Sequence, residues 1–299
     1  MAKRKPTMQG AMTALVTPFR HGDVDWTRLD ALVDLQIEAG IDWLVPCGTT
    51  GESPTLTHDE HGRVVEAVIE RAAGRVAVMA GTGSNATTEA VHRTRHAKQA
   101  GADAALIVAP YYNRPSPEGL FRHFATIAER VDLPIVLYNV PARTGVSIPN
   151  DVVVQLREHY DHIVGIKHAT GSVDGVTDLL ARCDIAVLSG DDALTLPIMA
   201  LGGVGLISVV ANLYPAAVKA LVDAGLRQDL AAARRVHAQV SRLAALLGSF
   251  GTNPIPIKTA MAIAGLIEEE FRLPLCPLDL EDRERLQQAL EGAQAIAFV

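Results

Sequence analysis

Short runs of apolar residues alternate with longer amphipathic stretches along most of this chain. The runs predict strands at residues 11–16, 43–47, 76–80, 104–109, 135–138, 163–167, 185–189 and 205–209. The stretches after them predict helices at residues 26–39, 57–73, 86–100, 116–130, 149–159, 173–182, 192–201 and 214–227. Alternating strands and helices form a parallel sheet, and eight such units in about 225 residues favour a closed (β/α)8 TIM barrel over an open sheet.

Local start and stop signals support these elements. Thr57 and Glu60 have the spacing of a capping box at the start of a helix. The sequence Ser-Pro-Glu at residues 116–118 is a second start signal. A helix end, a glycine, an aspartate and a strand follow one another at residues 38–42 and again at 99–103. This repetition indicates one supersecondary unit used twice.

The C-terminal part of the chain has a different pattern. Helical periodicity without a convincing strand appears near residues 229–248, 256–268 and 280–296. We therefore expect two domains, a catalytic barrel at residues 1–228 and an all-helical domain at residues 229–299. The segment at residues 251–254 joins this helical part to the barrel.

Composition and charge narrow the class of protein. The chain has 299 residues, is 48% hydrophobic and carries a formal net charge of −7. It has no basic stripe that would bind nucleic acid, and its dense cationic cluster at residues 3–5 is expected to be a solvated end. No apolar stretch approaches the ~18 residues of a membrane span, and no signal peptide is recognisable. Cys47, Cys183 and Cys276 lie far apart, which fits a reducing cytoplasm better than a disulfide framework or a zinc site.

Lys167 is the most informative candidate for chemistry. It ends a short apolar run and precedes a Gly/Thr turn, and the catalytic groups of a barrel gather at such strand ends. Desolvation disfavours the charged form of a lysine, and a neutral amine can attack a ketone to form a Schiff base. On position alone, an ordinary lysine that extends to water explains the pattern as well.

Polar residues at the other strand ends supply the further groups that a Schiff-base reaction needs. Tyr138 can act as the acid and base that imine formation needs, and the hydroxyls of Thr49 and Tyr112 could pass its proton to solvent. The Thr50 hydroxyl and neighbouring backbone amides suit a small carboxylate, and Arg143 offers a planar fork for a second one. A site with one amine, one phenol and two carboxylate-binding positions indicates a reaction in which a 2-keto acid adds to a second acidic substrate.

Two other motifs suggest alternative kinds of site, one for a dinucleotide and one for a metal ion. Residues 81–86 match G-x-G-x-x-A after a strand, with Asp103 near the expected distance for a dinucleotide site. The eight-unit pattern argues against the open sheet that such a site requires, so we expect these glycines to allow a tight turn under the pocket. His58, Glu60 and His61 could suggest a metal site, but their spacing is not H-E-x-x-H and the capping box already explains Glu60. We expect no metal and no cofactor.

Six ordered motifs resemble those of the pyruvate-dependent class I aldolase family that includes dihydrodipicolinate synthase and N-acetylneuraminate lyase. They are G-T-T-G-E-S (48–53), P-Y-Y-N-R-P (110–115), Y-N-V-P-A-R-T-G (138–145), G-I-K-x-A-T-G (165–171), S-G-D-D (189–192) and N-P-I-P-I-K (253–258). The resemblance runs from about residue 10 to about residue 290. Arg143 and the pair Thr49-Thr50 favour the synthase branch over the sialic-acid lyases.

The resemblance implies a role for individual residues. Lys167 matches the lysine that forms a Schiff base with pyruvate. Thr50 matches a contact to the pyruvate carboxylate, with backbone contacts nearby from Gly190 and Ile207. Arg143 matches the residue that receives the carboxylate of aspartate semialdehyde. The proton relay corresponds to Tyr138, Thr49 and Tyr112, the last expected from a neighbouring subunit.

The resemblance also implies an effector site for L-lysine, formed by Ser53, His58, His61, Asn85, Glu89 and Tyr111. Glu89 would take the α-amino group, and an occupied site could disturb the relay through the neighbour of Tyr111. Pro54 departs from the small residue expected there, and the alternative is a solvated helix start. His168 also departs from the glutamate common in relatives, and strand alternation predicts that it points off the site axis.

The function implied by the resemblance is condensation of pyruvate with L-aspartate 4-semialdehyde to 4-hydroxy-tetrahydrodipicolinate, in lysine and diaminopimelate biosynthesis. A cytoplasmic homotetramer, built as a dimer of dimers, is expected. Two alternatives remain open. One is a sister aldolase that acts on a hydroxy keto acid or keto sugar acid, and the other is a non-catalytic paralogue on the same barrel.

Overall fold

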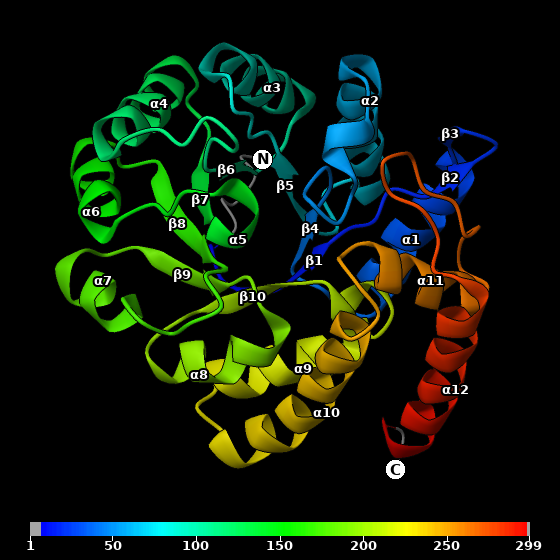
Figure 1. Cartoon of the computed structure of the whole chain (residues 1–299). Coiled ribbons are helices and arrows are strands. Elements are labelled where there is room, and N and C mark those ends of the chain that lie inside the picture. The colour runs from blue at the N-terminus through cyan, green and yellow to red at the C-terminus, as the bar shows by residue number, and fades with distance from the viewer. Residues whose placement is uncertain (1–6, 298–299) are drawn as a thin grey trace.

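The barrel strands close in the order β1-β10-β9-β8-β7-β6-β5-β4, each parallel to its neighbours (Figure 1). The computed structural model describes residues 7–297, with side chains as far as residue 292, so the basic cluster at residues 3–5 lies outside it. The strands are β1 (Gly10–Ala14), β4 (Trp43–Val45), β5 (Ala77–Gly81), β6 (Ala104–Val108), β7 (Ile135–Asn139), β8 (Ile163–His168), β9 (Ala186–Ser189) and β10 (Gly205–Ser208). This closed sheet confirms the predicted TIM barrel.

Helices surround the barrel on its outer face (Figure 1). They are α1 (Trp26–Glu38), α2 (His58–Ala72), α3 (Thr87–Ala100), α4 (Pro117–Arg130), α6 (Asn150–His159), α7 (Val176–Arg182), α8 (Thr195–Ala200) and α9 (Pro215–Leu226). The predicted capping box is present, because the Thr57 hydroxyl accepts from the Glu60 amide and the Glu60 carboxylate accepts from the Thr57 amide. The Ser116 hydroxyl caps α4 in a similar way.

Alternation along the strands separates two packing layers. On β7, Ile135 and Leu137 pack outward against the helices, whereas Val136 and Tyr138 point into the barrel. The interior layers also contain Met12, Trp43, Met79, Leu106, Leu188 and Ile207. Because neighbouring residues on a strand face opposite sides, only every second residue near a strand end can reach the barrel mouth.

Several short elements escape the sequence prediction. They are the hairpin of β2 (Phe19–Arg20) and β3 (Asp23–Val24), the one-turn helix α5 (Pro141–Thr144), and the 3₁₀ helices η1 (Ser53–Thr55) and η3 (Val210–Asn212). The helix predicted at 192–201 is divided into the 3₁₀ helix η2 (Asp192–Leu194) and α8. Two predicted helices are also too long. The helix expected at 173–182 begins only at Val176, after Gly175 at φ +79°, and the one expected at 256–268 ends at Ile263, before Gly265 at φ +75°. These glycines adopt a left-handed conformation that stops the helical pattern.

The C-terminal part is helical, with α10 (Leu230–Gly248), α11 (Ile255–Ile263) and α12 (Leu280–Ala297). Figure 1 shows α10 beside α9, and α12 packs against α10 and α11. These helices share one hydrophobic cluster with the barrel, in which Val240 and Ile257 lie with Leu15 and Leu221. The predicted domain boundary at residues 228/229 falls in the turn between α9 and α10 and stays a prediction. Within the described residues, no helix is long and apolar enough to span a membrane.

Candidate active site

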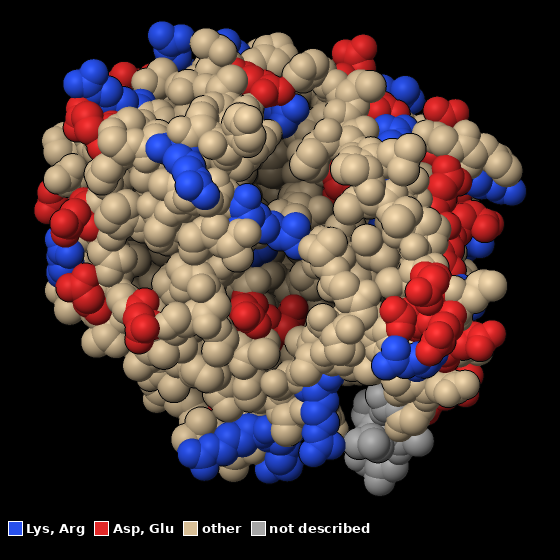
Figure 2. All heavy atoms as spheres, viewed as in Figure 1, with Lys and Arg blue, Asp and Glu red and all other residues tan. Residues whose placement is uncertain are grey.

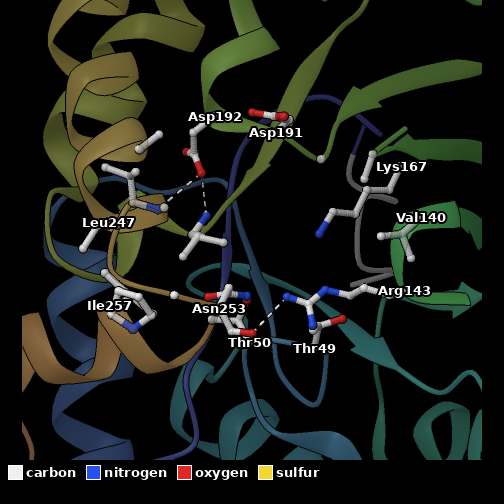
Figure 3. A pocket seen from close by; sticks show the side chains of 18 of the residues that line it. Thr49, Thr50, Val140, Arg143, Lys167, Asp191, Asp192, Leu247, Asn253 and Ile257 are labelled. Atoms are coloured by element: carbon white, nitrogen blue, oxygen red, sulfur yellow. Dashed lines mark hydrogen bonds between the residues drawn. The ribbon is translucent and has the colours of Figure 1, made fainter. Parts of the chain in front are cut away.

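A cavity of about 270 Å³ lies where the barrel strands end. Figure 2 shows the surface hollowed near the centre of this face. The cavity is lined by residues that follow β4, β7, β8, β9 and β10 and by residues of the C-terminal helices, and Figure 3 shows most of them. Those lining residues are Thr49, Thr50, Tyr138, Val140, Arg143, Lys167, Ala169, Gly190, Asp191, Asp192, Val209, Val210, Ala244, Leu247, Gly248, Gly251, Asn253, Pro256 and Ile257.

Lys167 projects into this cavity from β8 (Figure 3). Only 6% of the residue is exposed, and its side-chain amine has no hydrogen bond or ion pair to another described residue. Tyr138 is its register partner on β7, and the Lys167 Nζ lies 4.4 Å from the centroid of the tyrosine ring. The register of two neighbouring strands therefore places an amine and a phenol next to each other at the barrel mouth.

Gly190 provides the space that the Lys167 side chain occupies. A Cβ atom at this position would lie 2.6 Å from the Cβ of Ala169 and 2.9 Å from the Cε of Lys167, both well inside van der Waals contact. The Gly190 amide also donates to the His168 carbonyl at 2.8 Å. The glycine found in the S-G-D-D motif is thus required by the packing of the lysine.

Thr50 has its hydroxyl fixed by a residue that sequence reasoning left without a role. The Asn253 side-chain amide donates to Thr50 Oγ1 at 2.9 Å, across 203 residues of chain. Asn253 precedes α11 and lines the cavity itself. Its place in the N-P-I-P-I-K motif was visible in the sequence, but its contact to the β4 loop depends on how the C-terminal region packs.

Arg143 crosses the mouth of the cavity from the other side. It belongs to α5, and its Nη2 donates to the carbonyl of Asn253 at 2.9 Å (Figure 3). The same Nη2 lies 3.4 Å from the hydroxyl of Thr252. A guanidinium has five N–H donors in one plane, so these contacts leave donors for a carboxylate. Thr50, Asn253 and Arg143 therefore form one connected group.

Asp192 is a buried acid on the opposite wall. Its carboxylate accepts from the Ser208 hydroxyl and from the Val209 amide at 3.0 Å, which joins η2 to the end of β10. Burial raises the pKa of Asp192 and outweighs these hydrogen bonds, which act in the other direction. Sequence reasoning identified the motif but assigned Asp192 no function.

Three predicted residues lie outside the cavity lining in this chain. Ile207 is fully buried, because strand alternation turns its side chain into the barrel interior, and the residues of this segment that line the cavity are Val209 and Val210. The backbone contact predicted for Ile207 stays a prediction. Tyr112 is 90% exposed and its backbone has a φ of 73°. His168 bonds through Nε2 to the Ser172 carbonyl, away from the cavity, as the alternation predicts.

A second cavity of about 510 Å³ shares a wall with the first, formed by Thr49, Tyr138, Val140 and Arg143. From the predicted effector set, Ser53, His58, Glu89 and Tyr111 line it. His61 does not line it, since its Nε2 lies 2.9 Å from the Gly81 carbonyl and burial lowers its pKa to about 4. Asn85 is also absent from the lining, and its carbonyl accepts from the side chain of Asn113.

The glycine-rich segment and the histidine–glutamate cluster serve strand packing and helix capping in this fold. The segment at residues 81–86 follows a strand of a closed barrel, which excludes the open sheet of a dinucleotide site. A Cβ on Gly81 would lie 2.3 Å from the Cys47 carbonyl, and one on Gly83 would lie 2.5 Å from the Val108 amide, so both glycines permit close strand approach. Glu60 is paired with Arg272 through two oxygens. The described residues contain no group of three or more His, Cys, Asp or Glu side chains suited to a metal.

Glu52 and Lys258 form a fully buried ion pair just behind the threonine loop. The Lys258 Nζ also lies 4.4 Å from the ring centroid of Phe19 and 4.9 Å from that of Phe271. The second oxygen of Glu52 accepts from the Arg272 amide at 3.3 Å. Both members of the pair stand in sequence motifs, but nothing in the sequence placed them together.

A buried, unpaired lysine beside a tyrosine at the mouth of a (β/α)8 barrel is the arrangement of a class I aldolase, an enzyme that works through a Schiff base. The comparison of whole sequences narrows this class. A family profile described as Dihydrodipicolinate synthetase family matches residues 7–293, and the chain belongs to that family.

Known relatives agree with this assignment. The 4-hydroxy-tetrahydrodipicolinate synthase of Nitratidesulfovibrio vulgaris is 50% identical over 287 residues, which cover 95% of this chain and 98% of the relative. The chloride-inhibited dihydrodipicolinate synthase from Acinetobacter baumannii, solved in complex with pyruvate, superposes with a TM-score of 0.93 at 45% identity, covering 96% of this chain and 99% of the other. The enzyme from Cyanidioschyzon merolae, solved with lysine bound, gives a TM-score of 0.91 at 35% identity, covering 96% and 98%.

Proposed function

We propose that this chain condenses pyruvate with L-aspartate 4-semialdehyde to give 4-hydroxy-tetrahydrodipicolinate, a step in lysine and diaminopimelate biosynthesis. The observation that carries the proposal is the cavity in which the unpaired amine of Lys167 faces the Tyr138 ring, with Thr50 and Arg143 nearby. The relatives named above support the same reaction.

In the first half of the reaction, the amine nitrogen of Lys167 adds to the carbonyl carbon of pyruvate. Tyr138 returns a proton to the departing oxygen, so that water leaves and an imine forms. The imine then loses a proton from its methyl carbon and becomes an enamine. The Thr50 hydroxyl and the neighbouring backbone amides hold the pyruvate carboxylate, and Gly190 leaves space for the adduct on Lys167.

In the second half, the enamine carbon attacks the aldehyde carbon of aspartate semialdehyde, whose carboxylate Arg143 binds. The oxygen of the former aldehyde takes a proton and becomes a hydroxyl. The amino group of the substrate then adds to the imine carbon, and the amine of Lys167 leaves. Ring closure thus regenerates the free lysine, so no cofactor is needed to balance the reaction.

The proton relay extends from Tyr138 through Thr49 to a Tyr112 supplied by a neighbouring subunit. The exposed ring of Tyr112, held by a backbone in the left-handed region, supports this role, because a subunit that covered it would bury the ring. The assembly is a homotetramer built as a dimer of dimers, with the dimer as the smallest active unit. Mixing inactive Tyr112→Phe and Lys167→Ala subunits tests this, since hybrids regain activity only if the tyrosine acts across the interface.

The second cavity is an effector site for L-lysine. Its lining contains Ser53, His58, Glu89 and Tyr111, and its shared wall contains Thr49 and Tyr138 of the relay. Glu89 receives an ammonium group of the effector, and an occupied site shifts the relay residues. Steady-state rates in millimolar L-lysine check this proposal, and an unchanged rate contradicts it.

The decisive test of the reaction is intact-protein mass spectrometry after borohydride reduction. Wild-type protein with pyruvate should gain one pyruvate-sized adduct, Lys167→Ala should gain none, and the control Lys98→Ala, which removes a half-exposed lysine on α3, should behave as wild type. Added aspartate semialdehyde should consume the adduct. An adduct that ignores aspartate semialdehyde would point to a sister aldolase with another acceptor, and no adduct would remove the enzyme assignment.

A further inference from the structure

Glu89 already has three partners in the second cavity. The Arg93 Nη2 lies 2.7 Å from Oε1, the His58 Nδ1 lies 3.3 Å from the same oxygen, and the Ser84 hydroxyl donates to Oε2. Both carboxylate oxygens are therefore occupied in the protein itself. A cationic ligand that approaches Glu89 has to share the carboxylate with these groups or replace one of them.

Arg93 is the strongest of the three partners. It lies one helical turn after Glu89 on α3, its side chain is only 13% exposed, and it lines the cavity. Its Nη1 is also within 3.5 Å of the Gly83 carbonyl, which holds the guanidinium beside the cavity wall. An arginine stays charged at any working pH, and a partly buried ion pair is screened less than a surface pair. Glu89 thus faces a permanent cation.

We propose that Arg93 is an internal competitor for the effector, a side chain that occupies Glu89 and so lowers the affinity of the cavity for L-lysine. This inference rests on the proposed effector site and specifies how its sensitivity is set. A ligand ammonium bound at Glu89 would share the carboxylate with the guanidinium and be repelled by it. Removing the charge at residue 93 relieves both effects, and we expect about a tenfold gain in affinity, within the usual range of such coupling.

The direction in which the affinity for L-lysine changes after loss of Arg93 distinguishes this role from two others. If Arg93 only stabilised the helix or the cavity wall, its loss would loosen the site and weaken lysine binding. If Arg93 bound the carboxylate of the effector, its loss would also weaken binding. Only competition for Glu89 predicts tighter binding after the substitution, and a gain of affinity cannot come from a damaged fold.

The test is isothermal titration calorimetry with L-lysine on the full-length protein. Arg93→Leu should bind about tenfold more tightly than wild type. Arg93→Gln is a second variant of similar length, for the case that leucine does not fold, and should shift in the same direction. Arg93→Lys keeps the charge and should stay near wild type. Arg95→Leu, which removes an exposed arginine of the same helix outside the cavity, is the matched control and should change nothing.

Each outcome has a distinct meaning. Tighter binding by the neutral variants, or binding by them where wild type shows none, supports the competitor. Wild-type binding with equal or weaker binding by Arg93→Leu and Arg93→Gln overturns the inference and leaves the effector site standing. Absence of binding in every protein overturns both the inference and the effector proposal, while the pyruvate adduct on Lys167 reports on the reaction separately.

Discussion

Two lysines of this chain are buried near aromatic rings, and they have opposite surroundings. Lys167 is 6% exposed and its Nζ lies 4.4 Å from the Tyr138 ring centroid, whereas Lys258 is 0% exposed and lies 4.4 Å from that of Phe19. Lys258 is ion-paired with Glu52, but Lys167 has no carboxylate partner among the described residues and faces a cavity. Burial therefore does not by itself make a lysine reactive. The role proposed for Lys167 depends also on the cavity that it faces and on the lack of a carboxylate partner among the described residues.

The paired lysine has a positioning role. Burial lowers the pKa of Lys258, and the Glu52 carboxylate acts against that shift. Such a pair contributes little net stability because both charges lose water, but it fixes one geometry. Glu52 has a left-handed backbone at φ 54° in the loop that carries Thr50, and Lys258 follows Ile257 of the cavity lining. The pair thus fastens the loop that carries Thr50 to α11.

Of the substitutions that test the contrast between the two buried lysines, replacement of Lys167 should have the largest effect. Lys167→Met should abolish the pyruvate adduct and lower turnover by at least about 10⁴-fold, because the proposed nucleophile is lost. The fold should stay intact, since methionine fills the space of an unpaired amine. Mass spectrometry and a coupled rate assay measure the effect. Lys258→Met serves as the contrast, because Lys167 in that variant should still be modified wherever the protein is folded.

Lys258→Met tests whether the buried ion pair of Lys258 with Glu52 stabilises the fold. It leaves the Glu52 carboxylate buried without its cation, which should cost about 3–5 kcal/mol of unfolding free energy. Urea denaturation measures this loss. The matched control is Lys98→Ala, which breaks a 3.8 Å surface contact to Asp132 and should change stability by less than about 1 kcal/mol. Equal stability of Lys258→Met and wild type would show that the pair is not structural.

A methyl group added at Gly190 tests whether Lys167 needs the space that it occupies in the cavity. Gly190→Ala places a methyl group 2.9 Å from the Lys167 Cε and 2.6 Å from the Ala169 Cβ. We expect turnover to fall about tenfold and stability to fall by about 1–3 kcal/mol, since the lysine has to move from its position beside Tyr138. Gly248→Ala is the control, because a Cβ on that cavity-lining glycine meets nothing within 4 Å. An identical loss in both variants would contradict the packing argument.

Residues at the strand ends could be predicted from the sequence, whereas contacts between distant parts of the chain could not. Lys167, Tyr138 and Arg143 follow or end barrel strands, so the rule that strand ends gather at one face predicted their meeting. Their roles stay proposals. The contacts Glu52–Lys258 and Thr50–Asn253 join residues 206 and 203 positions apart, and no local period encodes how the C-terminal helices approach the barrel. The 3₁₀ helices η1 and η3 and the helix α5 escaped for a related reason, because they are too short to show a repeat.

The smallest expected effect is also the sharpest test of positioning. In the double variant Glu52→Gln/Lys258→Met, neither charge is left buried alone, so stability should return to within about 1–2 kcal/mol of wild type. The loop that carries Thr50 would still have lost its directional tie to α11. We therefore expect the KM for pyruvate to remain raised about three- to tenfold while kcat changes less, because the proposed role of Thr50 is to contact the bound carboxylate and Lys167 is untouched. If the double variant recovers both stability and KM, the ion pair acts only through the fold, and the two buried lysines differ in reactivity without being linked in function.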